Sequence, residues 1–141
     1  MHIGVPAETR ANEARVAATP ETVKKLVTQG HRISVQSGAG LPASYIDDAY
    51  AQAGADILDA AAAFSAEIVL KVQSPTAEEL ALIKPNAVLI GMLDPFNTEN
   101  TARLAAANVT AFALEAAPRT TRAQSRTCCR RRRISPDTRP C

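Results

Sequence analysis

Residues 67–92 read EIVLKVQSPTAEELALIKPNAVLIGM, a stretch with two apolar runs on either side of a helix-forming segment. The runs at 68–72 and 87–92 are short and almost uninterrupted, as expected of strands buried on both faces of a parallel sheet. Between them, Thr76 and Glu79 have the spacing of a capping box, which predicts that a helix begins there. Because parallel neighbours need a crossover connection, the stretch predicts a strand–helix–strand unit.

The same alternation continues in both directions along the chain. Apolar runs predict further strands, and capping residues followed by apolar stripes predict the helices between them. The predicted strands are 2–5, 32–36, 56–58 and 109–114. One predicted helix begins near 19, and three others span 46–53, 60–64 and 97–107. This order is typical of an α/β fold, a Rossmann-like or flavodoxin-like parallel sheet with helices on both faces.

Composition divides the 141 residues into a body and a tail. Residues 1–125 hold ten Lys and Arg against thirteen Asp and Glu, whereas 126–141 hold six Arg, one Asp and all three cysteines. The body is 1–125, a mildly acidic α/β domain, and the tail at 126–141 has no apolar periodicity, so it is predicted to be disordered. No apolar run approaches the roughly 20 residues of a membrane-spanning helix, and no signal peptide is visible. A body without cysteine is consistent with a cytoplasmic protein.

Ligands of parallel α/β sheets gather at the carboxyl ends of the strands, and two cations are candidates there. Arg15 lies just before a predicted helix and could clamp a carboxylate or phosphate, or be a surface or ion-paired arginine. Lys71 interrupts an apolar strand near its end. It could bind an anion or a carbonyl, or be a solvated lysine at the strand end.

Other motifs are weak. Gly38-Ala39-Gly40 is an incomplete phosphate-loop pattern and more typical of a tight turn. The sequence contains no complete G-x-G-x-x-G, P-loop, zinc-ligand spacing or nucleophile elbow, so it predicts neither a catalytic residue nor a metal site. The segment 118–124, PRTTRAQ, is rich in hydrogen-bond donors and reads either as a ligand loop or as a polar linker.

Six segments occur together in an order that identifies a family: MHIGVP (1–6), EARVAATP (13–20), SGAG (37–40), AGA (53–55), VLKV (69–72) and PRTTRAQS (118–125). Together they resemble the N-terminal region of the alpha subunits of proton-translocating NAD(P) transhydrogenases. Alanine dehydrogenases share the first motifs and the Leu-Lys-Val strand. The segment after residue 117 favours transhydrogenase over alanine dehydrogenase.

The resemblance implies a function for a longer protein. In that family a subunit with two Rossmann-like domains binds NAD(H) in the cleft between them. It exchanges hydride with a partner domain that binds NADP(H), and a membrane partner couples the exchange to proton movement. The resemblance also implies a homodimer in the cytoplasm, peripheral to the inner membrane through its partner subunits, with no nucleic acid involved.

The resemblance also assigns residues. Arg119, Arg122, Gln124 and Ser125 match the NAD-binding loop of the family, and Arg15 and Lys71 match positions that hold the substrate carboxylate and carbonyl in alanine dehydrogenases.

The family pattern stops at Arg126. When the tail is written in permitted codons, one inserted base restores SLDLLSSQANIAGYPAV, which fits the family. We therefore expect an out-of-frame tail on a truncated first domain that is inactive alone. Two alternatives stay open: a fragment of an alanine dehydrogenase, and a small binding module whose basic tail engages nucleic acid.

Overall fold

The computed structural model describes residues 1–117, and Arg119, Arg122, Gln124, Ser125 and the tail from Arg126 lie outside the described residues. Six parallel strands form one sheet in the order β3-β2-β1-β4-β5-β6. They are β1 (His2–Val5), β2 (Arg32–Gln36), β3 (Asp56–Leu58), β4 (Ile68–Gln73), β5 (Val88–Met92) and β6 (Thr110–Ala113). The order is that of a Rossmann sheet rather than the flavodoxin alternative.

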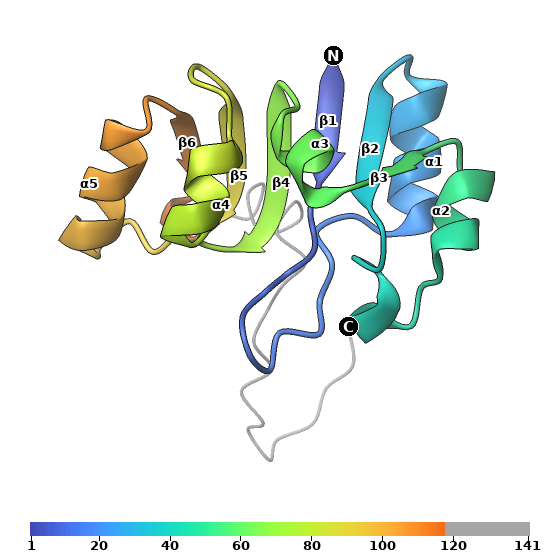
Figure 1. Cartoon of the computed structure of the whole chain (residues 1–141), viewed down its shortest axis with the longest axis horizontal. Helices are drawn as coiled ribbons and strands as arrows, with labels where there is room; N and C mark the ends of the chain where they lie inside the picture. The colour runs from blue at the N-terminus through green and yellow to red at the C-terminus, as the bar shows by residue number, and fades with distance from the viewer. Residues whose placement is uncertain (118–141) are drawn as a thin grey trace.

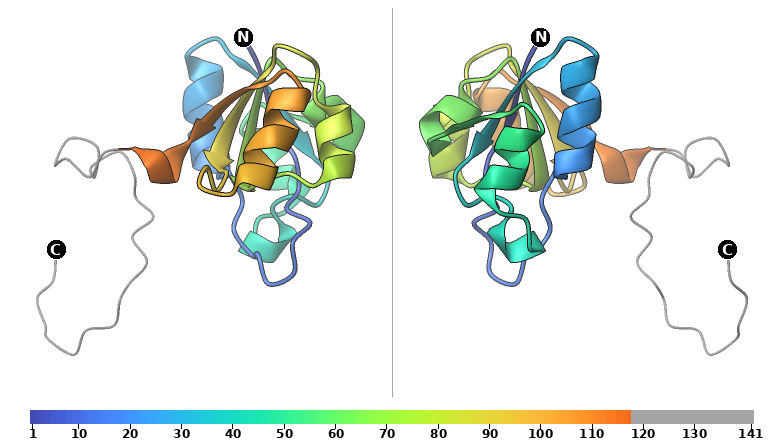
Figure 2. Two further views of the ribbon diagram at one scale, coloured as in Figure 1. Left: turned by 90° about the vertical axis from the view of Figure 1, so that its left-hand side faces the viewer. Right: turned by 90° about the vertical axis from the view of Figure 1, so that its right-hand side faces the viewer.

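In the part of the chain that the structure describes, five α-helices connect the strands: α1 (Pro20–Thr28), α2 (Asp47–Gln52), α3 (Ala60–Phe64), α4 (Ala77–Leu82) and α5 (Thr98–Ala106). Short 3₁₀ turns follow β2 (η1, Leu41–Ala43) and β6 (η2, Leu114–Ala116). Helix α1 lies on one side of the sheet and α4 and α5 on the other (Figures 1 and 2). The predicted parallel sheet with helices on both faces is therefore confirmed.

Local sequence explains most helix starts. Thr19 caps α1 with Pro20 at its first position, and the capping box of Thr76 and Glu79 is present at α4. Asn97 caps α5 by accepting from two backbone amides. The last strand is shorter than predicted: it ends at Ala113, and the chain turns into η2 where the sequence indicated further strand.

The core is built in two clusters on opposite faces of the sheet. The first packs α1 and α2 against β1 and β2, and the second packs α3 and α5 against β4 and β5. The first comprises Ile3, Val5, Ala18, Val23, Ile33, Val35, Ala39, Tyr50 and Ala55, and the second Phe64, Val69, Ile83, Ala87, Leu89, Leu93 and Leu104.

The α1 side of the sheet is incompletely covered over β4, β5 and β6. Leu70, Ile90 and Phe112 are in register on this side and stay partly or largely exposed, Phe112 by 56%. Their neighbours Val69 and Leu89 point the other way and are fully buried. No helix among residues 1–117 covers this half of the face.

The strand order positions a site. From β1 the chain proceeds outward through β2 to β3, and from β4 it proceeds outward in the opposite direction to β6. The connections therefore diverge between β1 and β4, and in open α/β sheets ligands bind at the carboxyl ends of the strands at such a switch point. Of all neighbouring strands in this sheet, β1 and β4 share the fewest residue pairs, namely Ile3 with Ile68 and Gly4 with Val69.

Candidate functional site at the switch point

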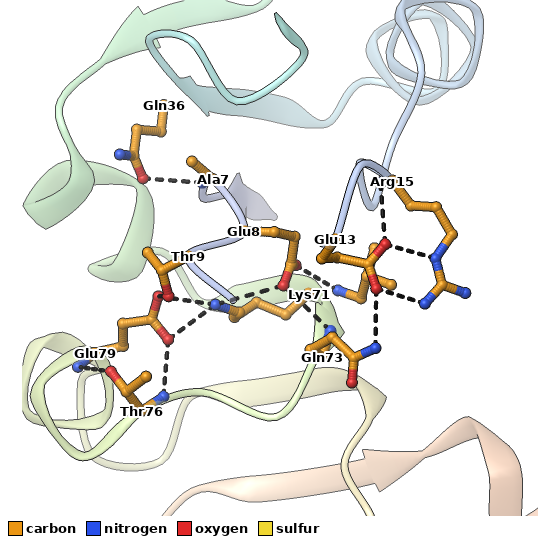
Figure 3. Close-up of polar contacts among 11 residues, drawn as sticks. Ala7, Glu8, Thr9, Glu13, Arg15, Gln36, Lys71, Gln73, Thr76 and Glu79 are labelled. Atoms are coloured by element: carbon orange, nitrogen blue, oxygen red, sulfur yellow. Dashed lines mark hydrogen bonds and ion pairs between the residues drawn. The ribbon is translucent and has the colours of Figure 1, made fainter. Parts of the chain in front are cut away.

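Lys71 lies at the switch point, near the carboxyl end of β4. Its Nζ donates to both carboxylate oxygens of Glu79 at 2.9 Å and lies 3.8 Å from Oε2 of Glu8 (Figure 3). The side chain is 1% exposed, and its ammonium lies 5.7 Å from the centre of the Phe64 ring. A buried lysine needs such compensation, because an unpaired ammonium in the interior is costly. Lys71 is thus held inside the site rather than at the solvent edge of the strand.

Glu79 joins three segments. Its carboxylate accepts from Lys71, from the hydroxyl of Thr9 at 2.9 Å and from the backbone N–H of Thr76 at 2.8 Å. Burial raises the pKa of Glu79, but these hydrogen bonds and the charge of Lys71 outweigh burial and hold the pKa below its usual value. Glu79, the third residue of α4 and part of its capping box, therefore also fixes Lys71 and the loop after β1.

The side chain of Glu8 accepts backbone amides of β4 beyond the point where β1 stops pairing with that strand. Pairing between β1 and β4 ends at Val69, and the β4–β5 register shifts between Leu70 and Gln73. In this irregular stretch Glu8 accepts the backbone N–H of Val72 at 2.6 Å and that of Gln73 at 3.3 Å. Its side chain is 3% exposed, and burial raises its pKa although the two amides and Lys71 act in the opposite direction.

Arg15 reaches the same edge of the sheet through Glu13. The carboxylate of Glu13 accepts from Nε of Arg15 at 2.7 Å and from its Nη2 at 2.6 Å, a two-pronged pair. Gln73 donates to Glu13 at 2.9 Å, which ties this pair to the end of β4. The hydrogen bonds from Arg15 come first among the causes that lower the pKa of Glu13 to about 2. The Arg15 side chain is 47% exposed, so its outer face meets solvent.

A polar cavity of about 410 Å³ lies beside this cluster, at the ends of β4 and β5 and the start of α5. Its walls carry two guanidinium groups, two carboxylates, three carboxamides, a hydroxyl and one methionine. They are Arg10, Gln73, Ser74, Met92, Asp94, Asn97, Glu99, Asn100 and Arg103. The buried hydroxyl of Ser74 has no hydrogen-bond partner among residues 1–117. The charges balance, so the cavity suits a polar ligand better than a multiply charged anion.

The structure brings together the two candidates from the described part of the sequence, Arg15 and Lys71, at one edge of the sheet. Sequence reasoning missed Glu8, Glu13 and Gln73, which surround them. It found Glu79 as a helix cap and not as the partner of Lys71. Gly38 lies in a tight turn, as expected, with φ of +77°. Its backbone N–H donates to the carboxylate of Asp47.

The described residues contain no group of three or more His, Cys, Asp and Glu side chains that could hold a metal ion. Within residues 1–117, no helix has the length and apolar character required to cross a membrane.

Comparison with known proteins identifies the family. Residues 4–129 match the family described as "Alanine dehydrogenase/PNT, N-terminal domain". The chain belongs to this family. Both kinds of enzyme named by the family occur among its relatives.

One relative is the NAD(P) transhydrogenase subunit alpha of Haemophilus influenzae, 40% identical over 126 residues, which cover 89% of this chain and 25% of the relative. The alanine dehydrogenase of Bacillus subtilis is 44% identical over 94 residues, covering 66% of this chain and 25% of the relative. A solved transhydrogenase from Sinorhizobium meliloti superposes with a TM-score of 0.85 at 41% identity, covering 89% of this chain and 38% of that one. The chain thus spans between about a quarter and two fifths of these relatives.

Proposed function

We propose that this chain represents the first domain of the NAD(H)-binding alpha subunit of an NAD(P) transhydrogenase. The observation that carries the proposal is the extent of the sequence match: the transhydrogenase subunit alpha of Haemophilus influenzae covers 89% of the chain, whereas the alanine dehydrogenase of Bacillus subtilis covers 66%. In the structural comparison the difference has the same sign but is smaller, 89% for the transhydrogenase against 82% for an L-alanine dehydrogenase. The additional matched length favours the transhydrogenase branch of the family. The whole protein would transfer hydride between NADH and NADP and couple this to proton translocation.

The cavity beside the switch point fits part of a nicotinamide nucleotide. The carboxamides of Asn97 and Asn100 and the hydroxyl of Ser74 offer both donors and acceptors, as a ribose or a carboxamide group requires. The balanced charge of the walls does not favour the pyrophosphate, which a second domain would hold. When bound, NAD(H) supplies the hydride chemistry, and the residues of this domain bind and orient it.

The finer assignments extend the same proposal. Arg119, Arg122, Gln124 and Ser125 form the NAD-binding loop. Arg15, whose side chain is 47% exposed, would bind a carboxylate, and Lys71 would contact a substrate oxygen only after its ammonium turns from Glu79. NADP(H) binds on a partner subunit, a membrane partner carries the proton path, and the intact subunit is a cytoplasmic homodimer peripheral to the inner membrane.

A domain exchange tests the proposal. Residues 1–117 of this chain replace the matching domain of the transhydrogenase from Sinorhizobium meliloti, and the chimera is assayed with its partner subunits for hydride transfer from NADH to an NADP analogue. We expect transfer by the chimera and none by the 141-residue chain with the same partners, because hydride transfer needs both nucleotides positioned together. Oxidation of L-alanine with NAD by the chimera would instead support the alanine dehydrogenase alternative. A folded chimera without either activity contradicts the proposal.

The tail is tested separately by sequencing the coding DNA from the codon of Ala123 onward. We propose that one missing base causes the departure at Arg126, so a frame that continues the family pattern is expected. An uninterrupted reading frame without that continuation would make 126–141 a genuine product. Retardation of DNA at low salt that is lost when 126–141 are deleted would then support the nucleic-acid alternative.

A further inference from the structure

The buried cluster at the switch point contains two carboxylates around one ammonium. Glu8, Glu79 and Lys71 have side chains that are 3%, 9% and 1% exposed. Two negative charges and one positive charge thus share an environment with little water, where the excess negative charge is costly. Uptake of one proton would make the cluster neutral, and the two carboxylates differ in how readily they could take it up.

Glu79 is poorly suited to hold that proton. Each of its oxygens accepts a hydrogen bond from Lys71 at 2.9 Å, and Thr9 and Thr76 donate to it as well. A proton on either oxygen would replace an accepted bond with a clash between donors.

Glu8 makes fewer and longer contacts at Oε2, which lies 3.3 Å from the backbone nitrogen of Gln73 and 3.8 Å from Nζ of Lys71.

We propose that Glu8 is a proton-binding side chain whose protonation releases the backbone amide of Gln73 and loosens the Glu13–Arg15 pair. The proton comes from solvent and forms an O–H bond on Oε2, and no other covalent bond changes. Oε1 still accepts the backbone N–H of Val72, so Glu8 stays attached to β4 at one point.

Protonation of Glu8 breaks the contact with Gln73 because it places two donors face to face. Once protonated, Oε2 carries a donor, and it faces the N–H of Gln73 and the ammonium of Lys71, which are donors too. The opposing donors separate, and the end of β4 loses one of its two attachments to the loop after β1. The β4–β5 register is already irregular here, so the segment can move without breaking a regular ladder.

Gln73 transmits the change to Arg15. Its side chain donates to Glu13 at 2.9 Å, and Glu13 in turn holds Nε and Nη2 of Arg15. A shift of the Gln73 backbone therefore moves one of the anchors of the pair that fixes the arginine (Figure 3). Acid would thus alter the position of the Arg15 guanidinium through Gln73 and Glu13.

The electrostatics agree with this geometry. Within residues 1–117, the charged groups that act on Glu8 are Lys71 on β4 and Glu79 on α4. Burial raises the pKa of Glu8 above 4.5, and Glu79 acts in the same direction, against the two amides and Lys71. The pKa of Glu79 is lowered overall, so Glu8 is the carboxylate that takes up the proton first.

The experiment is an NMR titration of the whole chain between pH 8 and 4. It follows the carboxyl carbon of Glu8, the backbone amides of Val72 and Gln73, and Nε of Arg15. We expect the Glu8 carbon to titrate with a midpoint above 4.5, and the Gln73 amide and Arg15 Nε to shift with the same midpoint. A midpoint at or below 4.5, or a Gln73 amide or an Arg15 Nε that does not shift, overturns the proposal.

Two variants complete the test. Glu8→Gln should abolish the step at Gln73 and Arg15, whereas Glu78→Gln, an exposed neighbour on α4 that also removes one carboxylate, should preserve it. Persistence of the step in Glu8→Gln, or its loss in Glu78→Gln, contradicts the assignment to Glu8. If Glu8→Gln does not fold, the wild-type titration of the Glu8 carboxyl carbon still decides the question.

Discussion

Replacing Lys71 by methionine tests whether the cluster at the switch point supports the fold. The substitution keeps a long apolar stem against Phe64 but removes the ammonium from between Glu79 and Glu8. Both carboxylates stay buried, and breaking a buried pair from one side costs about 3–5 kcal/mol. For a domain of this size that corresponds to a decrease in Tm of roughly 10 °C or more.

The assay is urea unfolding followed by far-UV circular dichroism, since the chain has no tryptophan for fluorescence. The loss should be greatest at high pH. Without Lys71 the pKa values of Glu8 and Glu79 rise above those of the unfolded chain, and a raised folded-state pKa gives stability that is lost as pH rises. The variant should therefore recover stability relative to wild type between pH 8 and 5.

The matched control is Lys25→Met, which removes a lysine that is 71% exposed and paired with Glu21 on the surface of α1. It should leave the unfolding midpoint nearly unchanged. A Lys71→Met variant within about 1 kcal/mol of wild type, well short of the loss expected for a broken buried pair, would refute the reasoning. So would a loss that does not depend on pH.

Three further predictions address other parts of the structure. In Arg15→Ala the pKa of Glu13 should rise from about 2 toward 4.5, because the hydrogen bonds from Arg15 are gone. NMR of the Glu13 carboxyl carbon measures this shift. The depressed pKa gives stability above pH 4.5 that is lost as pH falls toward 2, so this variant should unfold at a higher pH in acid. Gly4→Ala should lower the urea midpoint, by about 1–3 kcal/mol or more in free energy, because its Cβ would overlap the backbone carbonyl of Ala63; an unchanged midpoint would contradict this close approach. Phe112→Ser should reduce self-association in analytical ultracentrifugation, because it removes an exposed aromatic side chain from the uncovered apolar face of the sheet. Equal association of both proteins would exclude that face.

Sequence reasoning succeeded where the physical cause is local. The capping box of Thr76 and Glu79 depends on two residues three apart, and the buried strands on runs of adjacent apolar side chains, so both could be predicted. The parallel sheet followed from the alternation of these elements. The end of β6 was misplaced because Leu114 continues the apolar pattern, although the backbone there turns into η2.

The site was predicted only in part because its partners are distant in sequence. Glu8 lies 64 residues before the amide of Val72 that it binds, and Thr9 lies 70 before Glu79. No periodicity connects such residues, and they meet because β1 and β4 are neighbours in the sheet. Lys71 could be recognised as unusual from its apolar surroundings, but nothing in the sequence indicated which carboxylate would hold it.

Because β1 and β4 share few residue pairs, the sheet consists of two halves, β3-β2-β1 and β4-β5-β6, that are weakly joined to each other. Among residues 1–117, two residue pairs join these halves, and beyond them the side chain of Glu8 holds the backbone of β4. Ile68 and Leu70 of β4 pack against the first core cluster, so bending between β1 and β4 would shift these two side chains against that core. Relative motion of the two halves would change the spacing of the side chains at the switch point. The amides of Val72 and Gln73 should exchange with solvent sooner than their neighbours in either core.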